Sequence, residues 1–384
     1  MASLRVGVSF APAAATAAGE VKRQMGDGGF SLLVLFCADS YDLPALASAM
    51  RAAFPPPTAI IGCTTAGEIG SAGYQNGSLV AIGFLAEHFA AATVAIENLG
   101  VFAMADCRAL VEEALRRATW QRESRGFGDS LALLLVDGLS RREEPLGRAV
   151  QLVLGDIPVI GGSAGDSLHF ERTAVFHDDR VIDNAAVLAV ISTDTPFSII
   201  KTQHFERTEG RMVVTGARPA ERVVTEINGF PAALEYARII GLPVEELSPM
   251  AFAAYPVVVR VGGQEYVRSI QKVNPDHSLS FYCAIDEGIV LSRAQGLDAL
   301  ANLEGAIDAA AAEIGPLQAV LACDCILRSL EFRQRGQTEI MSAALRAHRV
   351  FGFSTFGELH MGIHVNQTFT GVAFGYPDAT RERP

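Results

Sequence analysis

The chain has 384 residues, of which 49% are hydrophobic and 19% charged, and its formal net charge is −12 at pH 7. This apolar composition excludes a disordered chain, and the acidic balance argues against nucleic acids and anionic membranes, which both need a basic protein surface. The length predicts two domains, and because no run of eighteen apolar residues lacks a charge, we expect no membrane-spanning helix.

The amino-terminal residues 5–10 alternate like a strand, and the alanine-rich stretch that follows predicts a helix. The apolar stretch before residues 14–18 is too weak for a secretory signal peptide, so we expect a cytoplasmic protein. Six cysteines are present, and residues such as Cys37 and Cys63 stand inside apolar runs. This placement favours reduced, buried thiols over a disulfide framework.

One unit then occurs three times along the chain: a buried strand, a helix, a second strand ending in a glycine-bounded turn, and a third strand. The second strands with their turns are 59–68, 158–166 and 350–358. Each turn carries a hydroxyl residue, a glycine and an acid in the same order: Thr65, Gly67 and Glu68; Ser163, Gly165 and Asp166; Thr355, Gly357 and Glu358.

The flanking segments of the three units agree as well. Helices are expected at 43–54, 144–154 and 337–347, preceded by strands at 31–37, 131–137 and 318–323 and followed by strands at 77–84, 185–191 and 367–374. Apolar strands that alternate with helices predict an α/β fold whose sheets are largely parallel or mixed, with crossover helices.

The repeated turns have two interpretations. Hydroxyls and carboxylates can bond the backbone of their own turn, which would make each triad a structural staple. Alternatively, the triads form a polar ring at the carboxyl ends of the strands, where α/β sheets bind ligands. The three acids would also suit a small-molecule hydrolase. Because no phosphate loop, dinucleotide fingerprint or metal-ligand cluster accompanies them, we predict a binding protein and not an enzyme.

Residues 197–293 differ from the repeats and predict an α+β insertion or second domain. We expect paired strands at 198–215 around Gly210, a turn at Asn228-Gly229, and a helix at 234–240 closed by Gly241. The remaining strands are expected at 256–261, 266–272 and 278–284, joined by hairpin turns at Gly262-Gly263 and at residues 274–276.

Several of these segments resemble the FIST family, in order along nearly the whole chain. Residues 60–68 and 159–166 are similar to the glycine segments of the FIST N-terminal domain, and residues 213–236 look like the junction between the family's halves. Cys325 with Arg328, the stretch 352–358 and Asn366-Gln367-Thr368 resemble the FIST C-terminal domain. The resemblance implies domains at 1–220 and 221–384.

The resemblance also implies a function, that of a bacterial sensory protein which binds a small ligand at the junction. Its output would act in trans on a sensor histidine kinase or a cyclic-di-GMP enzyme, and a homodimer is compatible with this role. An amino acid is one alternative ligand. The residues that the resemblance and the repeat together place at the ligand are the three triads with Cys325, Arg328 and Asn366.

One branch of the family binds haem and senses nitric oxide, and residues 202–205 and 276–286 look closer to that branch. Haem iron needs a strong axial donor, usually histidine, in an apolar pocket. His204 follows an apolar strand near the junction and is the best candidate, with His169 as the runner-up. A structural histidine is the alternative at both positions.

A histidine pair and a cysteine thiol each have a functional and a purely structural interpretation. His360 and His364 stand four residues apart, but the four ligands of a zinc site at the usual spacing are missing. The thiol of Cys325 beside Arg328 could have a lowered pKa, although burial favours a packed, unreactive cysteine.

Overall fold

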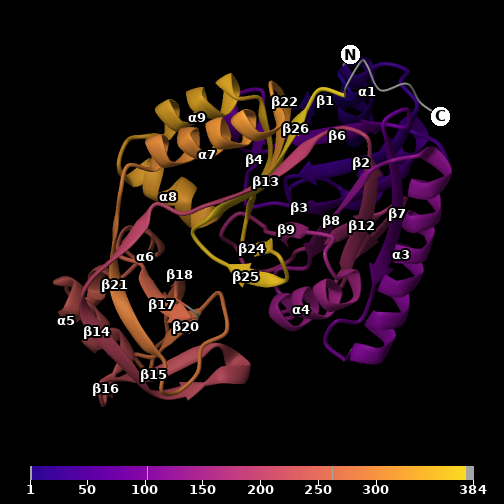
Figure 1. The fold of residues 1–384 in the computed structure, drawn as a ribbon. Coiled ribbons are helices and arrows are strands. Elements are labelled where there is room, and N and C mark those ends of the chain that lie inside the picture. The colour runs from indigo at the N-terminus through magenta and orange to yellow at the C-terminus, as the bar shows by residue number, and fades with distance from the viewer. Residues whose placement is uncertain (1, 102, 262, 378–384) are drawn as a thin grey trace.

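The computed structural model describes residues 2–377 apart from residues 102 and 262. The chain folds into two units, visible in Figure 1. The larger unit, the body, contains residues 2–202 and 297–377 and holds all three repeats, whereas the second domain contains residues 203–296. Among the described residues, no helix combines the length and the apolar character needed to cross a bilayer.

The first repeat forms a mixed sheet in the order β1-β6-β2-β3-β10-β11. The buried strand β2 (Phe30–Cys37) pairs parallel with β3 (Ala59–Thr64), and helix α2 (Leu43–Ala53) is the crossover between them. The Asp42 side chain caps α2 by accepting a hydrogen bond from the N–H of Ala45 at 3.1 Å. The other elements of this layer are β1 (Leu4–Ser9), α1 (Ala14–Met25), β6 (Leu79–Leu85), β10 (Val175–His177) and β11 (Arg180–Ile182).

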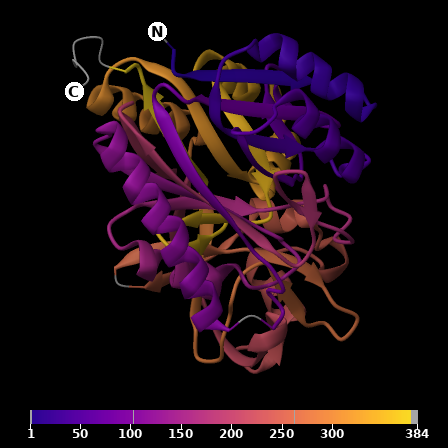
Figure 2. The same cartoon turned by 90° about the vertical axis from the view of Figure 1, so that its right-hand side faces the viewer.

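The second repeat forms a sheet in the order β25-β24-β9-β8-β12-β7. Its elements are β7 (Phe89–Ile96), α3 (Met104–Arg125), β8 (Asp129–Val136), α4 (Glu143–Leu154), β9 (Val159–Ser163), β12 (Ala186–Thr193), β24 (Glu358–His360) and β25 (Ile363–Val365). Figure 2 shows α3 lying along the outer side of this sheet, where it packs against β7, β12 and α4.

The third repeat forms a sheet in the order β13-β26-β22-β23-β4-β5. Its elements are β4 (Glu68–Gly70), β5 (Gly73–Gln75), β13 (Phe197–Thr202), α7 (Ala299–Ile314), β22 (Leu317–Cys325), α8 (Ile326–Gln334), α9 (Thr338–Ala347), β23 (Val350–Thr355) and β26 (Phe369–Gly375). Each sheet of the described body contains one parallel pair, β2 with β3, β8 with β9, or β22 with β23. The predicted mixed α/β fold is therefore confirmed.

The three repeats exchange short hairpins in a closed cycle. The hairpin that follows each turn leaves its own sheet and pairs with the second strand of another repeat. The cycle runs through β4 on β23, β10 on β3, and β24 on β9. The sequence pattern predicted only a loop at these places, because the three-residue strands are too short to give a periodic signal. The exchange brings all three turns to one point of the body.

The main core lies between the inner faces of the three sheets. It contains apolar side chains from the first strand of every repeat, such as Val34, Leu133 and Leu321. Phe36 and Phe353 stack across the sheets with ring centroids 4.5 Å apart. Helices cover the outer faces and bury their apolar sides there.

The second domain is an antiparallel sheet in the order β18-β17-β21-β14-β15-β20-β19, with β16 paired to β15 and helices on one side. Its elements are β14 (Phe205–Arg218), η1 (Pro219–Glu221), β15 (Val223–Ile227), β16 (Phe230–Pro231), α5 (Ala232–Ile240), η2 (Val244–Glu246), α6 (Pro249–Ala254), β17 (Val257–Val261), β18 (Gln264–Arg268), β19 (Ile270–Val273), β20 (Leu279–Phe281) and β21 (Val290–Gly296). The turn at Asn228-Gly229, the helix that ends at Gly241 and the hairpin at residues 274–276 are confirmed.

The prediction of paired strands around Gly210 is wrong. β13 pairs with β26 in the body, whereas β14 pairs with β21 in the second domain. Gly210 lies inside β14 with φ 113°, where the pairing with β21 shifts register between Arg207 and Arg211. A glycine inside a strand marks either a turn or a β-bulge. Because β14 pairs with β21 on both sides of Gly210, this glycine lies in a bulge. In the predicted Gly262-Gly263 turn, residue 262 lies outside the described residues.

Candidate functional site

The three repeated turns meet and form a ring of backbone hydrogen bonds. The bonds run from Ala66 N to Ser354 O (2.9 Å), from Gly165 N to Thr64 O (3.0 Å) and from Ser163 N to Gly357 O (2.9 Å). The turns approach so closely that a methyl group on Gly165 would lie 2.7 Å from the backbone nitrogen of Ala66. The three turns therefore meet in a closed ring of backbone hydrogen bonds, and glycine at position 165 is needed for its closure.

In the first and third repeats the hydroxyl and the acid bind each other. Thr65 donates to Glu68, and Thr355 donates to Glu358. Glu358 also accepts the N–H and the hydroxyl of Thr368, at 3.2 and 2.6 Å, and Glu68 accepts the same pair of donors from Ser78. Burial raises the pKa of both carboxyls, that of Glu358 to about 8. These two acids thus staple their own turns.

The second repeat breaks this pattern. Asp166 accepts hydrogen bonds from three successive backbone N–H groups, those of Phe170, Glu171 and Arg172, at 2.9, 2.7 and 2.8 Å. The carboxylate is therefore turned toward the loop that follows it and away from its neighbouring hydroxyl. As a result, the Ser163 hydroxyl is buried without a hydrogen-bond partner among the described residues.

Three equivalent positions surround the ring, one for each repeat. Each forms where the first strand of a repeat ends, the following helix begins, and a segment from another repeat arrives. The first site joins residues 39–44 to residues 166–172, the second joins 137–143 to 357–366, and the third joins 324–328 to 73–75. The second domain contacts the body at the second and third sites, and the first site is an open pocket.

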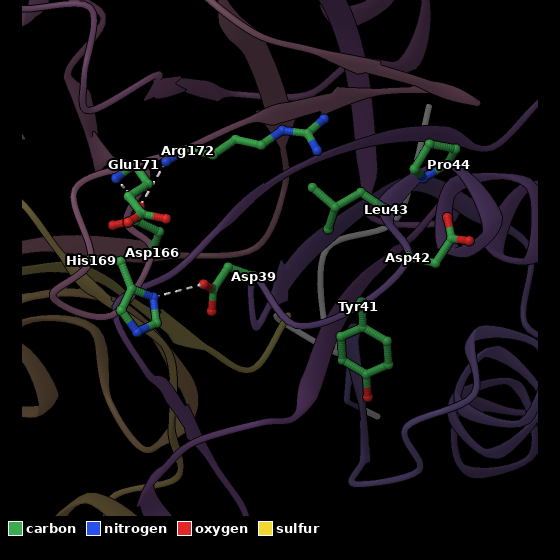
Figure 3. Close-up of a pocket in the computed structure, with 9 residues that line it drawn as sticks. All are labelled: Asp39, Tyr41, Asp42, Leu43, Pro44, Asp166, His169, Glu171 and Arg172. Atoms are coloured by element: carbon green, nitrogen blue, oxygen red, sulfur yellow. Dashed lines mark hydrogen bonds and ion pairs between the residues drawn. The ribbon is translucent and has the colours of Figure 1, made fainter.

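The first site is a surface pocket of about 340 Å³, drawn in Figure 3. It is lined by Asp39, Tyr41, Asp42, Leu43, Pro44, Asp166, His169, Glu171 and Arg172. His169 Nδ1 lies 3.3 Å from Asp39 Oδ2, and the imidazole is 64% exposed. No group of three or more His, Cys, Asp or Glu side chains in the described part of the chain is arranged to hold a metal ion.

The third site is filled by a buried network of charged side chains. Arg328 Nε donates to Asp324 Oδ1 at 2.6 Å, and Tyr74 donates to the other oxygen of the same carboxylate. Arg328 Nη1 also lies 2.8 Å from His204 Nδ1, whose Nε2 lies 2.8 Å from Glu331 Oε2. Because the backbone N–H of Leu297 donates to the carbonyl of His204 at 2.7 Å, both chain connections between the two units meet at this network.

Neither histidine that the sequence proposed for haem iron suits that role in this structure. Both ring nitrogens of His204 are engaged, by Glu331 and Arg328, and the ring is fully buried. Iron at either nitrogen would displace one of these two buried contacts, with Glu331 or with Arg328. His169 lines a polar pocket, whereas haem needs an apolar one. The residues present therefore do not fit haem in this conformation.

The second site contains a cluster of buried polar side chains without partners, which we call the junction cluster. Its members are Ser163, Tyr282, His364 and Asn366, each at most 7% exposed. Both hydroxyls, both imidazole nitrogens and both amide atoms lack a hydrogen-bond partner among the described residues. Native proteins leave few buried polar atoms without a hydrogen-bond partner, so we expect a bound molecule to pair with the atoms of this cluster.

Strand pairing places three members of the cluster on one sheet face. Leu359 in β24 lies opposite His364 in β25, and side-chain alternation puts Gly357 and Asn366 on the same face. The N–H of Ser163 donates to Gly357 on the other side. A methyl group on Gly357 would lie 2.1 Å from His364 Nε2 and 2.9 Å from Asn366 Nδ2. Glycine is thus required for these two side chains to pack over the strand.

The second domain closes this face. Arg222 donates to the carbonyl of Tyr282 at 2.5 Å and to Glu143, at the start of α4 in the body, at 2.7 Å. The Tyr282 ring centroid lies 6.0 Å from that of Phe170 and 6.1 Å from that of Phe356. The junction cluster therefore takes side chains from both units.

Models of known protein families match most of this chain. The FIST N domain model matches residues 31–229, and the FIST C domain model matches residues 232–361. The chain belongs to the FIST family. FIST domains are sensory ligand-binding domains of signal transduction, so the chain carries a sensory module.

Other comparisons add less to this FIST assignment. No curated protein matches the chain significantly. Among solved structures, the chain is similar to the cyanuric acid hydrolase from A. caulinodans with 10% sequence identity and a TM-score of 0.39, over 97% of this chain and 99% of that chain. The two family models meet between residues 229 and 232, within the second domain and near the predicted boundary at 220–221. The third repeat, which lies after that boundary, nevertheless packs with the first two repeats in the body.

The remaining residues predicted to bind the ligand of this FIST protein divide between the sites. Asn366 belongs to the junction cluster, Arg328 to the network of the third site, and Gly67 to the ring. Cys325 is buried at the start of α8, where burial raises the pKa of its thiol, so it is a packed cysteine. Sequence reasoning did not single out Tyr282, although this residue lies in the stretch 276–286 that resembles the haem-binding branch of the family.

Proposed function

We propose that this FIST protein is a sensory protein that binds a small polar molecule at the junction cluster. The observation that supports the proposal is the set of unpartnered polar atoms on Ser163, Tyr282, His364 and Asn366. A buried polar group without a partner costs about 1–3 kcal/mol, so an occupant that pairs with several of them is strongly favoured.

Binding at this place is suited to signalling because the cluster bridges both units. Asn366 and His364 belong to the body, and Tyr282 belongs to the second domain. A ligand that contacts both favours the closed arrangement over any arrangement in which the second domain has moved, and it shifts the equilibrium by its differential affinity. The two connections at His204 and Leu297 form the hinge for such a movement.

The output of this movement acts in trans. We propose a sensor histidine kinase or a cyclic-di-GMP enzyme as the partner, in line with the role of the family. Such partners work in the cytoplasm, where we also place this chain. Haem binding and nitric oxide sensing stay a separate prediction, which a Soret band in the haem-reconstituted protein would support.

A thermal-shift screen of the full chain against a metabolite library tests the ligand-binding proposal. A compound at one hundred times its Kd should raise the unfolding temperature of this 384-residue chain by roughly 3 °C. Asn366→Leu should abolish that shift, whereas His169→Ala, in the open pocket of the first site, should retain it. A library that produces no shift, or a shift that persists in Asn366→Leu and disappears in His169→Ala, would contradict the proposal.

A further inference from the structure

The chemistry of the ligand can be inferred from the charges around the junction cluster. Arg222 and Arg268 are the charged groups that act on His364 in the described structure, and together with burial they hold the pKa of its imidazole well below the usual range. His364 is therefore neutral, with one nitrogen as donor and the other as acceptor. Two arginines therefore act on the imidazole, and the carboxylates of Glu143 and Glu144 lie beside them.

The two arginines differ in how far they are neutralised. Arg222 donates to Glu143 at 2.7 Å, and both side chains are buried, so this cation has a close partner. The nearest carboxylate oxygen to Arg268, from Glu144, is 3.8 Å from Nη1, beyond hydrogen-bond distance. Both oxygens of that carboxylate also accept the N–H of Ala284, at 3.0 and 3.1 Å.

Arg268 thus carries unsatisfied donors in a buried place. Its Nε and Nη1 have no hydrogen-bond partner among the described residues, and its side chain is 17% exposed. It stands at the end of β18, which packs against β25, the strand of His364. The amide of Asn366 and the hydroxyl of Tyr282 add further unpartnered donors. A buried cation whose own donors lack an acceptor favours an anion as the missing group.

We propose that the ligand of the junction cluster carries a carboxylate, which Arg268, Asn366 and Tyr282 bind. The inference rests on the proposed function, because it assumes that the cluster takes a ligand. The remaining polar part of the ligand pairs with His364 and Ser163, each of which both donates and accepts. A cationic ligand is disfavoured because it would lie beside two arginines.

Matched pairs of small molecules test this ligand class. The full chain is titrated with formate, acetate, propionate and succinate, and in parallel with the corresponding amides, which keep the shape and lose the charge. We expect the carboxylates to raise the unfolding temperature and to show saturable heat in calorimetry, and the amides to bind at least tenfold more weakly.

Two variants place the binding at the cluster. Arg268→Gln should weaken carboxylate binding by about 10- to 100-fold, because a charge-assisted hydrogen bond is lost. Arg211→Gln, which removes an exposed arginine of the same domain, should leave it unchanged. Asn366→Asp keeps the shape of the side chain and adds a negative charge, so it should also abolish carboxylate binding while the protein stays folded by circular dichroism.

The possible outcomes separate this inference from the proposed function. If the amides bind as tightly as the carboxylates, or if only uncharged or cationic library compounds bind in an Asn366-dependent manner, the carboxylate class is wrong and the ligand site stands. If Arg268→Gln and Arg211→Gln weaken carboxylate binding equally, the assignment of Arg268 is wrong. If neither this panel nor the metabolite library produces a shift, both proposals fail.

Discussion

The three turns are equivalent by sequence but differ in their hydrogen bonds, so removing the hydroxyl from two of them should have different effects on stability. Thr355→Val keeps the shape of the side chain and removes a hydroxyl that donates to Glu358 and accepts the N–H of Gly357 at 3.1 Å. Ser163→Ala removes the corresponding hydroxyl of the second repeat, which has no partner among the described residues. The two substitutions are equivalent by sequence and should differ in energy.

The expected magnitudes follow from the contacts. Thr355→Val loses one hydroxyl–carboxyl hydrogen bond and leaves the buried N–H of Gly357 without an acceptor, so we expect a loss of about 2–3 kcal/mol in the free energy of unfolding. Ser163→Ala breaks no bond within the described protein and removes a buried hydroxyl that has no partner there, so in the ligand-free state it should leave the free energy of unfolding unchanged or raise it by up to about 1–3 kcal/mol.

Urea unfolding followed by far-UV circular dichroism measures both effects at constant pH and without added ligand. Thr65→Val is a second test, because its hydroxyl makes the same contacts in the first repeat. Equal losses for Ser163→Ala and Thr355→Val would refute the argument, because they would mean that the Ser163 hydroxyl has a structural partner. An effect of Thr355→Val below about 0.5 kcal/mol would refute the staple as well.

Three further predictions concern the same region. The pKa of Glu358 is about 8 in the folded protein, against an ordinary value of 4.5. The proton on this carboxyl therefore contributes stability to the folded state that is complete below about pH 4.5 and is lost as the pH rises through about 8. Urea unfolding between pH 6 and pH 9 should show this fall in the free energy of unfolding, and Glu358→Gln should remove it. Arg328→Met should cost about 3–5 kcal/mol by leaving the buried Asp324 charge unpaired, and adding Asp324→Asn should recover part of this loss. Gly357→Ala should cost about 1–3 kcal/mol and abolish the ligand-dependent thermal shift, because the added methyl group would displace His364, whereas Gly305→Ala, at a position with open space, should do neither.

The sequence alone determined the repeated unit and most of its elements. The apolar strands, the crossover helices and the Asn228-Gly229 turn depend on local patterns and on backbone conformations that a few residue types adopt, so they can be recognised without knowledge of the partner strands. The family resemblance also followed from the sequence, because the glycine-bounded turns keep their residues in order. For the triads of Thr65, Ser163 and Thr355 the sequence left two interpretations open, a structural staple and a polar ring that binds a ligand.

Only the tertiary structure decided what the members of the ring do. The hairpin exchange between repeats depends on which sheet edge is free, and no local pattern encodes that choice. Asp166 and Glu358 occupy equivalent positions, yet the first binds the loop that follows it and the second binds its own turn. This difference leaves Ser163 unpartnered. The second domain adds Tyr282 to the junction cluster and places Arg268 where its charge acts on His364, and only folding brings these residues to the body.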